Sequence, residues 1–133
     1  MESVKVSIKS SDLSKKITKE EVMAEKIQKD NLLTYSYLSS LGKCTLIYDK
    51  IKNSIHFQRL GDVNIKFDIF NNKHSSFIYV NDQLKTEFFL LGNNIIYKSN
   101  FLSFRYSLYD SMNNLKNNNN IINKIYISIE EII

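Results

Sequence analysis

The chain has 133 residues, of which 43% are hydrophobic and 24% charged, with a formal net charge of +4. This length and composition predict one folded domain over residues 1–133 and exclude a disordered or fibrous protein. The single cysteine, Cys44, excludes an intrachain disulfide, and the charged N-terminal segment lacks the apolar core of a secretory signal, so we expect a cytoplasmic protein. The longest purely apolar run, 88–91, is too short to cross a bilayer, so we expect no membrane insertion.

The first elements along the chain give two different signals. In segment 4–8, apolar and polar residues alternate, which is typical of a strand with one buried and one exposed face. Segment 12–29 instead contains Thr18-Lys-Glu-Glu, which resembles a capping box, and apolar residues that could share one face of a helix. A short helix followed by a strand from about residue 21 would satisfy both this signal and the strand signal of the rest of the chain, so helix and strand both stay open for 12–29.

The later segments repeat the strand signal. Alternation with a period of two recurs over 63–69, 102–108 and 125–129, and the eight Tyr and eight Phe residues also favour β-structure. Segments 46–48 and 88–91 are apolar on both faces. We expect a helix, a terminus or a second subunit to cover the outside of the barrel at these two segments.

Turns are predicted at clusters rich in asparagine, because the chain has no proline and three glycines. The clusters are 29–31, 51–54, 60–62, 71–75, 81–83, 92–94, 99–100 and 113–120, and we interpret the last as a long hairpin loop. Strand-length segments between regularly spaced turns are typical of antiparallel barrels and sandwiches. We therefore predict an all-β fold, an up-and-down antiparallel β-barrel of about eight to ten strands.

No residue pattern in the chain indicates catalysis. His56 and His74 have no ligand partner at metal-binding spacing, and no glycine-rich phosphate loop or nucleophile elbow is present. The adjacent pairs Glu20-Glu21 and Glu130-Glu131 point to different sides of a strand, so they do not form an acid–base pair. We predict a protein that is not an enzyme and that uses no metal and no cofactor.

The positive charge is spread over many segments. Lysines occupy predicted outward positions and acidic residues are interspersed among them, as on an ordinary solvated surface. An aromatic-rich basic barrel can nevertheless bind RNA or single-stranded nucleic acid, so nucleic-acid binding is our third functional hypothesis.

Arg59 departs from the alternation of its own strand. The period of two places it on the same face as Ile55 and Phe57, which is the predicted interior face. A guanidinium keeps its charge, so an inward Arg59 needs a carboxylate, carbonyl groups or an anionic ligand as its partner. The alternative is that Arg59 lies at the end of its strand and extends to the barrel rim.

The order of these segments resembles the YwiB-like family of small bacterial proteins of unknown function. The matching residues, over most of the chain, are segment 4–10, segment 29–37, Thr45 with Asp49, the Arg-Leu-Gly end of segment 55–61, Phe67, Tyr79 near Thr86, segment 104–108 and segment 123–127. The resemblance implies a calycin-type, lipocalin-like β-barrel and no established activity.

Our first functional hypothesis is a barrel that binds a small apolar or anionic amphipathic ligand in its interior. The predicted ligand contacts are Arg59, Phe57, Phe67, Tyr79, Phe104 and Tyr106. An interior filled by side chains, with no pocket, would contradict it. The second hypothesis is a protein-interaction or homo-oligomeric module, in which segment 88–91 packs against a partner or a second copy.

Overall fold

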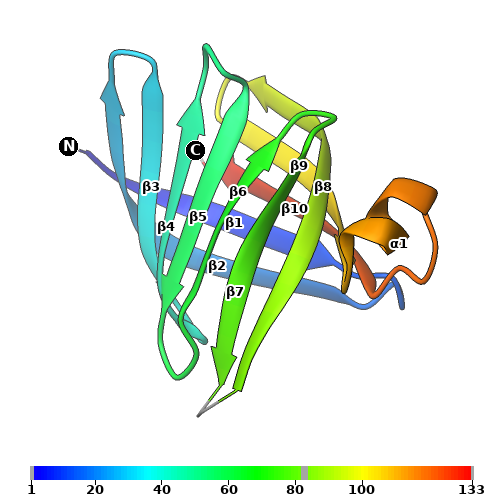
Figure 1. Cartoon of the computed structure of the whole chain (residues 1–133). Coiled ribbons are helices and arrows are strands. Elements are labelled where there is room, and N and C mark those ends of the chain that lie inside the picture. Colours follow the sequence, from blue (N-terminus) through cyan, green and yellow to red (C-terminus); the bar gives the residue numbers. More distant parts are fainter. Residues whose placement is uncertain (1, 82–83, 133) are drawn as a thin grey trace.

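The computed structural model describes residues 2–81 and 84–132 and confirms the all-β prediction. These residues form ten strands and one short helix (Figure 1). The elements are β1 (Glu2–Ser11), β2 (Ile17–Lys29), β3 (Leu32–Ser39), β4 (Gly42–Asp49), β5 (Ser54–Leu60), β6 (Ile65–Phe70), β7 (His74–Asn81), β8 (Leu84–Lys98), β9 (Phe101–Tyr109), α1 (Met112–Asn117) and β10 (Asn123–Glu131).

All ten strands belong to one antiparallel sheet that curls into a nearly closed barrel. Their order is β6-β5-β4-β3-β2-β1-β10-β9-β8-β7, so the first and last strands of the sheet are consecutive in the chain. Between β6 and β7 the structure has one isolated bridge, Phe70 with Lys73. Turn 71–73 also bonds to β8, since the Asn72 amide donates to the Gly92 carbonyl at 2.8 Å. This contact holds the two ends of the sheet together.

The barrel has two distinct ends, which are named here by their place in Figure 1. The lower end carries turns 40–41 and 61–64 and the adjoining ends of β7 and β8, and the upper end carries turns 30–31, 50–53 and 71–73. Between them, the inward side chains of the strands form one continuous apolar core. The predicted strands 4–8, 63–69, 102–108 and 125–129 all contribute to this core, which confirms the interpretation of their alternation.

Of the two alternatives left open for segment 12–29, the structure contains the strand and not the short helix. Residues 17–29 form β2, which pairs with β1 over ten positions, from Ile17 opposite Ser11 to Lys26 opposite Glu2. The hydrogen bonds of this long ladder and the burial of Ala24 outweigh a weak local helix propensity. Residues 12–16 form the turn between β1 and β2, where the carboxylate of Asp12 accepts hydrogen bonds from Ser14 and Lys16.

The structure also corrects two of the predicted turns. Cluster 92–94 lies inside β8, where the pairing with β7 has ended at Leu91 and a β-bulge after Asn93 interrupts the pairing with β9; Asn94 adopts a positive φ of 51°. Within cluster 113–120 the chain forms α1, which begins after Ser111 as N-cap and ends at Asn118 in the left-handed region. Asparagine tolerates the positive φ angles found at Asn94 and Asn118. The same tolerance is used in bulges, helix caps and loops, so asparagine alone does not tell them apart. Cluster 81–83 lies largely outside the described residues.

Helix α1 covers part of the outside of the barrel. It packs on β8 and β9, where Leu115 and Tyr109 are buried and the Tyr109 hydroxyl donates to the Asn118 side chain at 2.8 Å. Tyr109 lies opposite Phe89 in the register of the two strands. This helix is therefore one of the three covers expected over segment 88–91, and it belongs to the same chain.

Candidate functional site

Arg59 faces the interior of the barrel. In the register it lies between Cys44 of β4 and Ile65 of β6, and residues directly opposite each other in an antiparallel sheet share a face. Cys44 is buried and Ile65 packs against the core. The same inward row continues through Tyr37 of β3, which is also buried. The register thus places Arg59 on the inward face, one of the two alternatives left open by the sequence, and at the last position before the lower rim, where the other alternative put it.

The surroundings of Arg59 leave part of its guanidinium without a protein partner. Burial raises the pKa of Tyr37 and that of Tyr106, and the nearby charge of Arg59 opposes this rise at both phenols. The Nε atom of Arg59 is buried, and it has no hydrogen-bond partner among the residues that the structure describes. A buried donor without a partner is costly, so this atom marks a position where an acceptor would be stabilised.

A hollow of about 430 Å³ opens beside Arg59 at the lower end. We call it the Arg59 hollow, and it is lined by Leu38, Ser39, Ser40, Leu41, Gly42, Arg59, Gly61, Asp62 and Val63. The two glycines let turns 40–41 and 61–64 meet, because a Cβ atom on Gly61 would collide with the carbonyl of Leu41. The hollow therefore combines one cation, Arg59, and one carboxylate, Asp62, with an apolar wall of two leucines and a valine.

A second hollow of about 510 Å³ lies on the other side of turn 40–41. Its walls come from β1 and β2, including Ile8 and Thr18, and it also contains Glu20. The Glu20 carboxylate accepts a hydrogen bond from the Ser40 amide at 3.0 Å, which ties β2 to the turn. The lower end thus carries the acidic Glu20 on one side of this turn and the basic Arg59 on the other.

The predicted aromatic ligand contacts pack mainly against one another. The ring of Phe67 lies 5.3 Å from Phe57, 5.3 Å from Tyr106 and 5.6 Å from Phe77, measured between centroids. Phe104 is buried next to Tyr106, and Tyr79 lies 6.3 Å from Phe88. None of these five aromatic residues lines the Arg59 hollow, so Arg59 is the member of the predicted set that does. A ligand role for the five aromatic residues stays a prediction.

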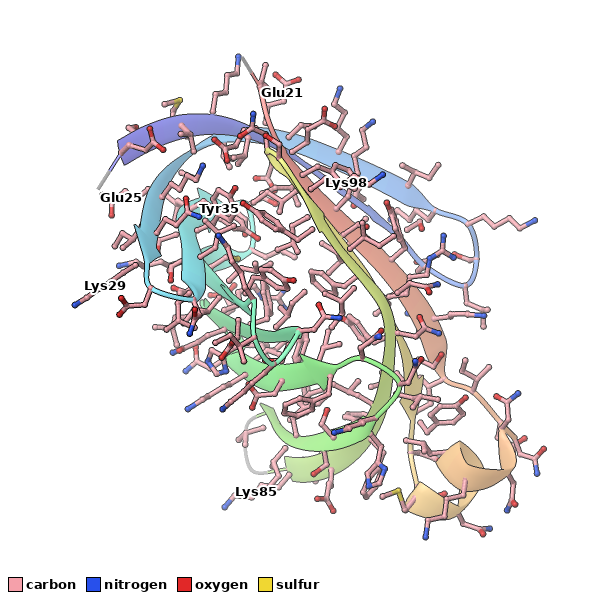
Figure 2. The ribbon with its side chains drawn as sticks, turned by 90° about the horizontal axis from the view of Figure 1, so that it is seen from above. Glu21, Glu25, Lys29, Tyr35, Lys85 and Lys98 are labelled. Atoms are coloured by element: carbon pink, nitrogen blue, oxygen red, sulfur yellow. The ribbon has the colours of Figure 1, made fainter. Side chains whose placement is uncertain are left out.

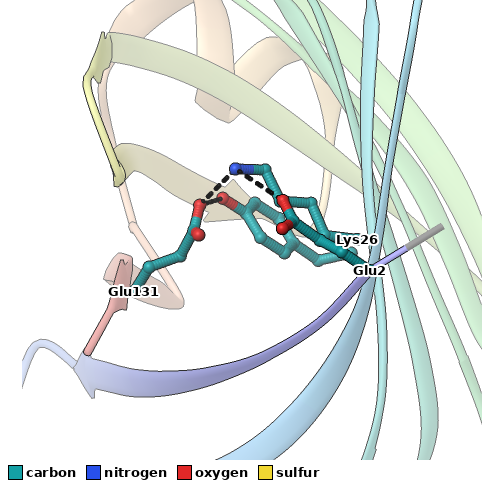
Figure 3. Close-up of polar contacts among 4 residues, drawn as sticks. Glu2, Lys26 and Glu131 are labelled. Atoms are coloured by element: carbon teal, nitrogen blue, oxygen red, sulfur yellow. Dashed lines mark hydrogen bonds and ion pairs between the residues drawn. The ribbon is translucent and has the colours of Figure 1, made fainter. Parts of the chain in front are cut away.

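A polar cluster at the upper end was not predicted from the sequence. Lys26 and Tyr35 both donate to the carboxylate of Glu131, at 2.8 and 2.7 Å, and Lys26 also lies 3.7 Å from Glu2 (Figure 3). Figure 2, seen from above, shows Tyr35 inside the ring of strands, while Glu25 and Lys29 lie outside it. The period of two could have revealed the cluster, because it puts Glu131 on the apolar face of its strand.

The upper cluster satisfies its own hydrogen bonds. Burial favours the neutral form of Glu131, but the hydrogen bonds from Lys26 and Tyr35 outweigh it and hold the pKa of this carboxyl below its usual value. The same hydrogen bond stabilises the charged form of Lys26 and therefore raises the pKa of the lysine. A closed set of charges with its own partners is typical of a structural contact, so we assign the cluster to stability and not to ligand binding.

The remaining candidate residues lie apart from both ends of the interior. His56 lies on the outer face, and its Nδ1 is 2.8 Å from the carboxylate of Asp68 on β6. Within residues 2–81 and 84–132, no three His, Cys, Asp or Glu side chains gather as a metal site. No helix in the same ranges is long and apolar enough to span a membrane.

The fold and the hollow define a nearly closed antiparallel barrel with a hollow at one end that Arg59 and Asp62 line. Its fold is similar to that of the ywiB protein from Bacillus subtilis, whose crystal structure aligns with a TM-score of 0.66 at 13% sequence identity. The alignment covers 98% of this chain and 92% of the Bacillus chain. No protein-family model and no curated protein matches the chain. The resemblance found in the sequence is therefore confirmed for the fold, and membership of the family stays a prediction.

Proposed function

We propose that the protein is a non-enzymatic cytoplasmic barrel that binds a small amphipathic anion at its lower end. The observation that carries the proposal is Arg59, an inward guanidinium whose buried Nε has no partner among the described residues. A carboxylate or similar group would accept a charge-assisted hydrogen bond from it. The apolar part of the ligand would lie against Leu38, Leu41 and Val63.

The packing of the aromatic rings determines how deep such a ligand sits. Because Phe57, Phe67 and Tyr106 already contact one another, a ligand does not need to enter the centre of the barrel. The Arg59 hollow, of about 430 Å³, is within the range of small-molecule sites and lies between two turns. The proposal is thus a site at the mouth of the barrel, with the anionic group pointing inward.

Replacing Arg59 by methionine is expected to weaken binding of decanoate, a simple amphipathic anion, by about tenfold or more. A hydrogen bond to a charged group contributes about 1.5–3 kcal/mol, and each 1.4 kcal/mol is about tenfold in affinity. Isothermal titration calorimetry of the purified protein measures this difference, and Arg59→Lys should retain part of the affinity.

Arg105→Met is the matched control for the binding experiment. Arg105 is exposed on the outer face of β9, where its guanidinium lies 4.9 Å from the ring of Tyr126. Loss of this arginine removes the same charge but leaves the hollow unchanged, so affinity should stay at the wild-type level. Equal affinities for wild type and Arg59→Met, or no binding of decanoate by the wild type, would refute the proposal.

Without ligand, Arg59→Met is expected to raise the free energy of unfolding by about 1 kcal/mol, because it removes a buried donor that has no partner. Gains of this kind are typical where a residue serves binding at a cost in stability. The midpoint of urea unfolding, measured for wild type and variant, checks this prediction. A lower midpoint for the variant would show that Arg59 is a structural residue.

A further inference from the structure

The lower end carries large apolar side chains on three neighbouring hairpins. Leu38 is 72% exposed, Leu41 is 64% exposed and Leu84 is 74% exposed, and Leu60 is also exposed. A single exposed leucine is ordinary on a protein surface. These four instead come from the β3–β4, β5–β6 and β7–β8 hairpins, whose ends all lie at the bottom of the barrel in Figure 1.

The strand register holds two of these leucines in a fixed relation to a lysine. Leu38, Lys43 and Leu60 lie opposite one another on β3, β4 and β5, and all three are exposed. Leu41 projects from the adjoining turn, where Gly42 and Gly61 bring the two hairpins into contact. The leucines of the first two hairpins therefore form one apolar rim, and Leu38 and Leu41 also line the Arg59 hollow.

Basic residues accompany this rim. Lys43, Lys66 and Lys85 are exposed on the strands of the same three hairpins, and Figure 2 shows Lys85 pointing away from the barrel. The acidic residues near the same end are Glu20, Asp62, Glu87 and, outside the described residues, Asp82. The charges at this end are mixed, and the three exposed lysines on separate hairpins are the groups that would contact negative charge on a partner surface.

We propose that the lower end docks onto anionic lipid bilayers and, building on the proposed function, that the Arg59 hollow receives its amphipathic anion there. Apolar side chains on separate turns can each enter the deformable headgroup region, while neighbouring lysines contact lipid phosphates. A folded protein partner would instead need a surface complementary to the exposed leucines of three hairpins and to the hollow beside them. Amphipathic anions concentrate at the same bilayer surface, so docking places the hollow beside its ligand.

Sedimentation with lipid vesicles tests the docking. The full-length protein is expected to sediment with mixed phosphatidylglycerol–phosphatidylcholine vesicles and to bind pure phosphatidylcholine vesicles much more weakly. Each lysine near an anionic surface contributes about fivefold to the affinity at low salt, so binding should fall as salt is raised. Leu41→Glu combined with Leu84→Glu should reduce the affinity about tenfold or more, because it replaces two apolar tips with negative charges.

Ile51→Glu is the control for the vesicle experiment. Ile51 is 73% exposed in turn 50–53 at the upper end, so the change is of the same kind at a site that does not face the bilayer. The proposal is overturned if the wild type does not bind anionic vesicles, or if Ile51→Glu weakens binding as much as the Leu41 and Leu84 changes. A dimer in sedimentation velocity that the leucine variant dissociates would identify a second copy as the occupant and also overturn it.

The calorimetry with decanoate separates this inference from the proposed function. Decanoate binding that depends on Arg59, without vesicle binding, removes the docking proposal alone. Vesicle binding that depends on Leu41 and Leu84, with no decanoate binding by the wild type, removes the proposed function and leaves the docking.

Discussion

Replacing Gly92 by valine is expected to lower the free energy of unfolding by about 3 kcal/mol, because the new side chain has no space. Gly92 is buried in β8, and a Cβ atom at this position would collide with the Ile69 side chain and the Phe70 carbonyl of β6. The backbone of Gly92 also bonds to turn 71–73, donating to the Lys73 carbonyl and accepting from the Asn72 amide. A valine would push apart the contact that closes the barrel.

The midpoint and slope of urea unfolding measure the effect of the Gly92 change. Ser76→Val is the matched control, since Ser76 is exposed on neighbouring β7 and its replacement should change stability by about 0.5 kcal/mol or less. A Gly92→Val protein as stable as this control would mean that the ends of the sheet separate without cost. The closure of the barrel at β6 and β7 would then have to depend on the aromatic side chains between them.

The sequence predicted the strands well because each strand carries its own signal. Alternation over 102–108 or 125–129 shows directly which residues face inward. A strand with one buried and one solvent-exposed face must carry this alternation. The same alternation put Arg59 on the inward face of its strand but left open whether its side chain extends to the barrel rim. The Arg59 hollow could not be predicted from the sequence. Turns 40–41 and 61–64 meet because β4 pairs with β5, and the residues within each turn do not determine that pairing.

Two segments were left open or predicted wrongly from the sequence. Over 17–29, helix propensity is a local property, whereas the pairing of β2 with β1 depends on residues from another part of the chain. Segment 113–120 was predicted as a loop, although local signals for the two ends of α1 are present in the sequence. Ser111 is the N-cap, whose side chain accepts from the Asn114 amide, and Asn118 ends the helix with a positive φ. An asparagine-rich segment can thus contain a capped helix.

Replacing Glu131 by glutamine is expected to lower the free energy of unfolding at neutral pH by about 3 kcal/mol, the lower part of the range for breaking a buried ion pair. The side chains of Lys26 and Glu131 are only 12% and 10% exposed, so the variant leaves the lysine charge largely buried. Glu2, at 3.7 Å, compensates for part of the loss. Tyr35→Phe, which removes one hydrogen bond to the carboxylate, should cost about 1 kcal/mol.

The double variant Lys26→Met with Glu131→Leu is the control for this cluster. It removes both charges and puts apolar side chains of similar size in their place, so stability should return close to that of the wild type. Urea unfolding of the wild type, Lys26→Met, Glu131→Leu and the double variant forms a complete cycle. If the double variant is as unstable as the sum of the single variants, the ion pair is not the cause of the effect.

The pH dependence of stability gives an independent check on Glu131. Its pKa is lower in the folded protein than in the unfolded chain, so the unfolded chain binds the proton more tightly. The stabilisation is therefore complete above the unfolded pKa, about 4.3, and is lost as the pH falls through the lower pKa of the folded state. Glu131→Gln removes this titration, so its free energy of unfolding should fall less steeply than that of the wild type between neutral pH and pH 3. Parallel curves for the two proteins would show that Glu131 does not hold a proton-linked ion pair with Lys26.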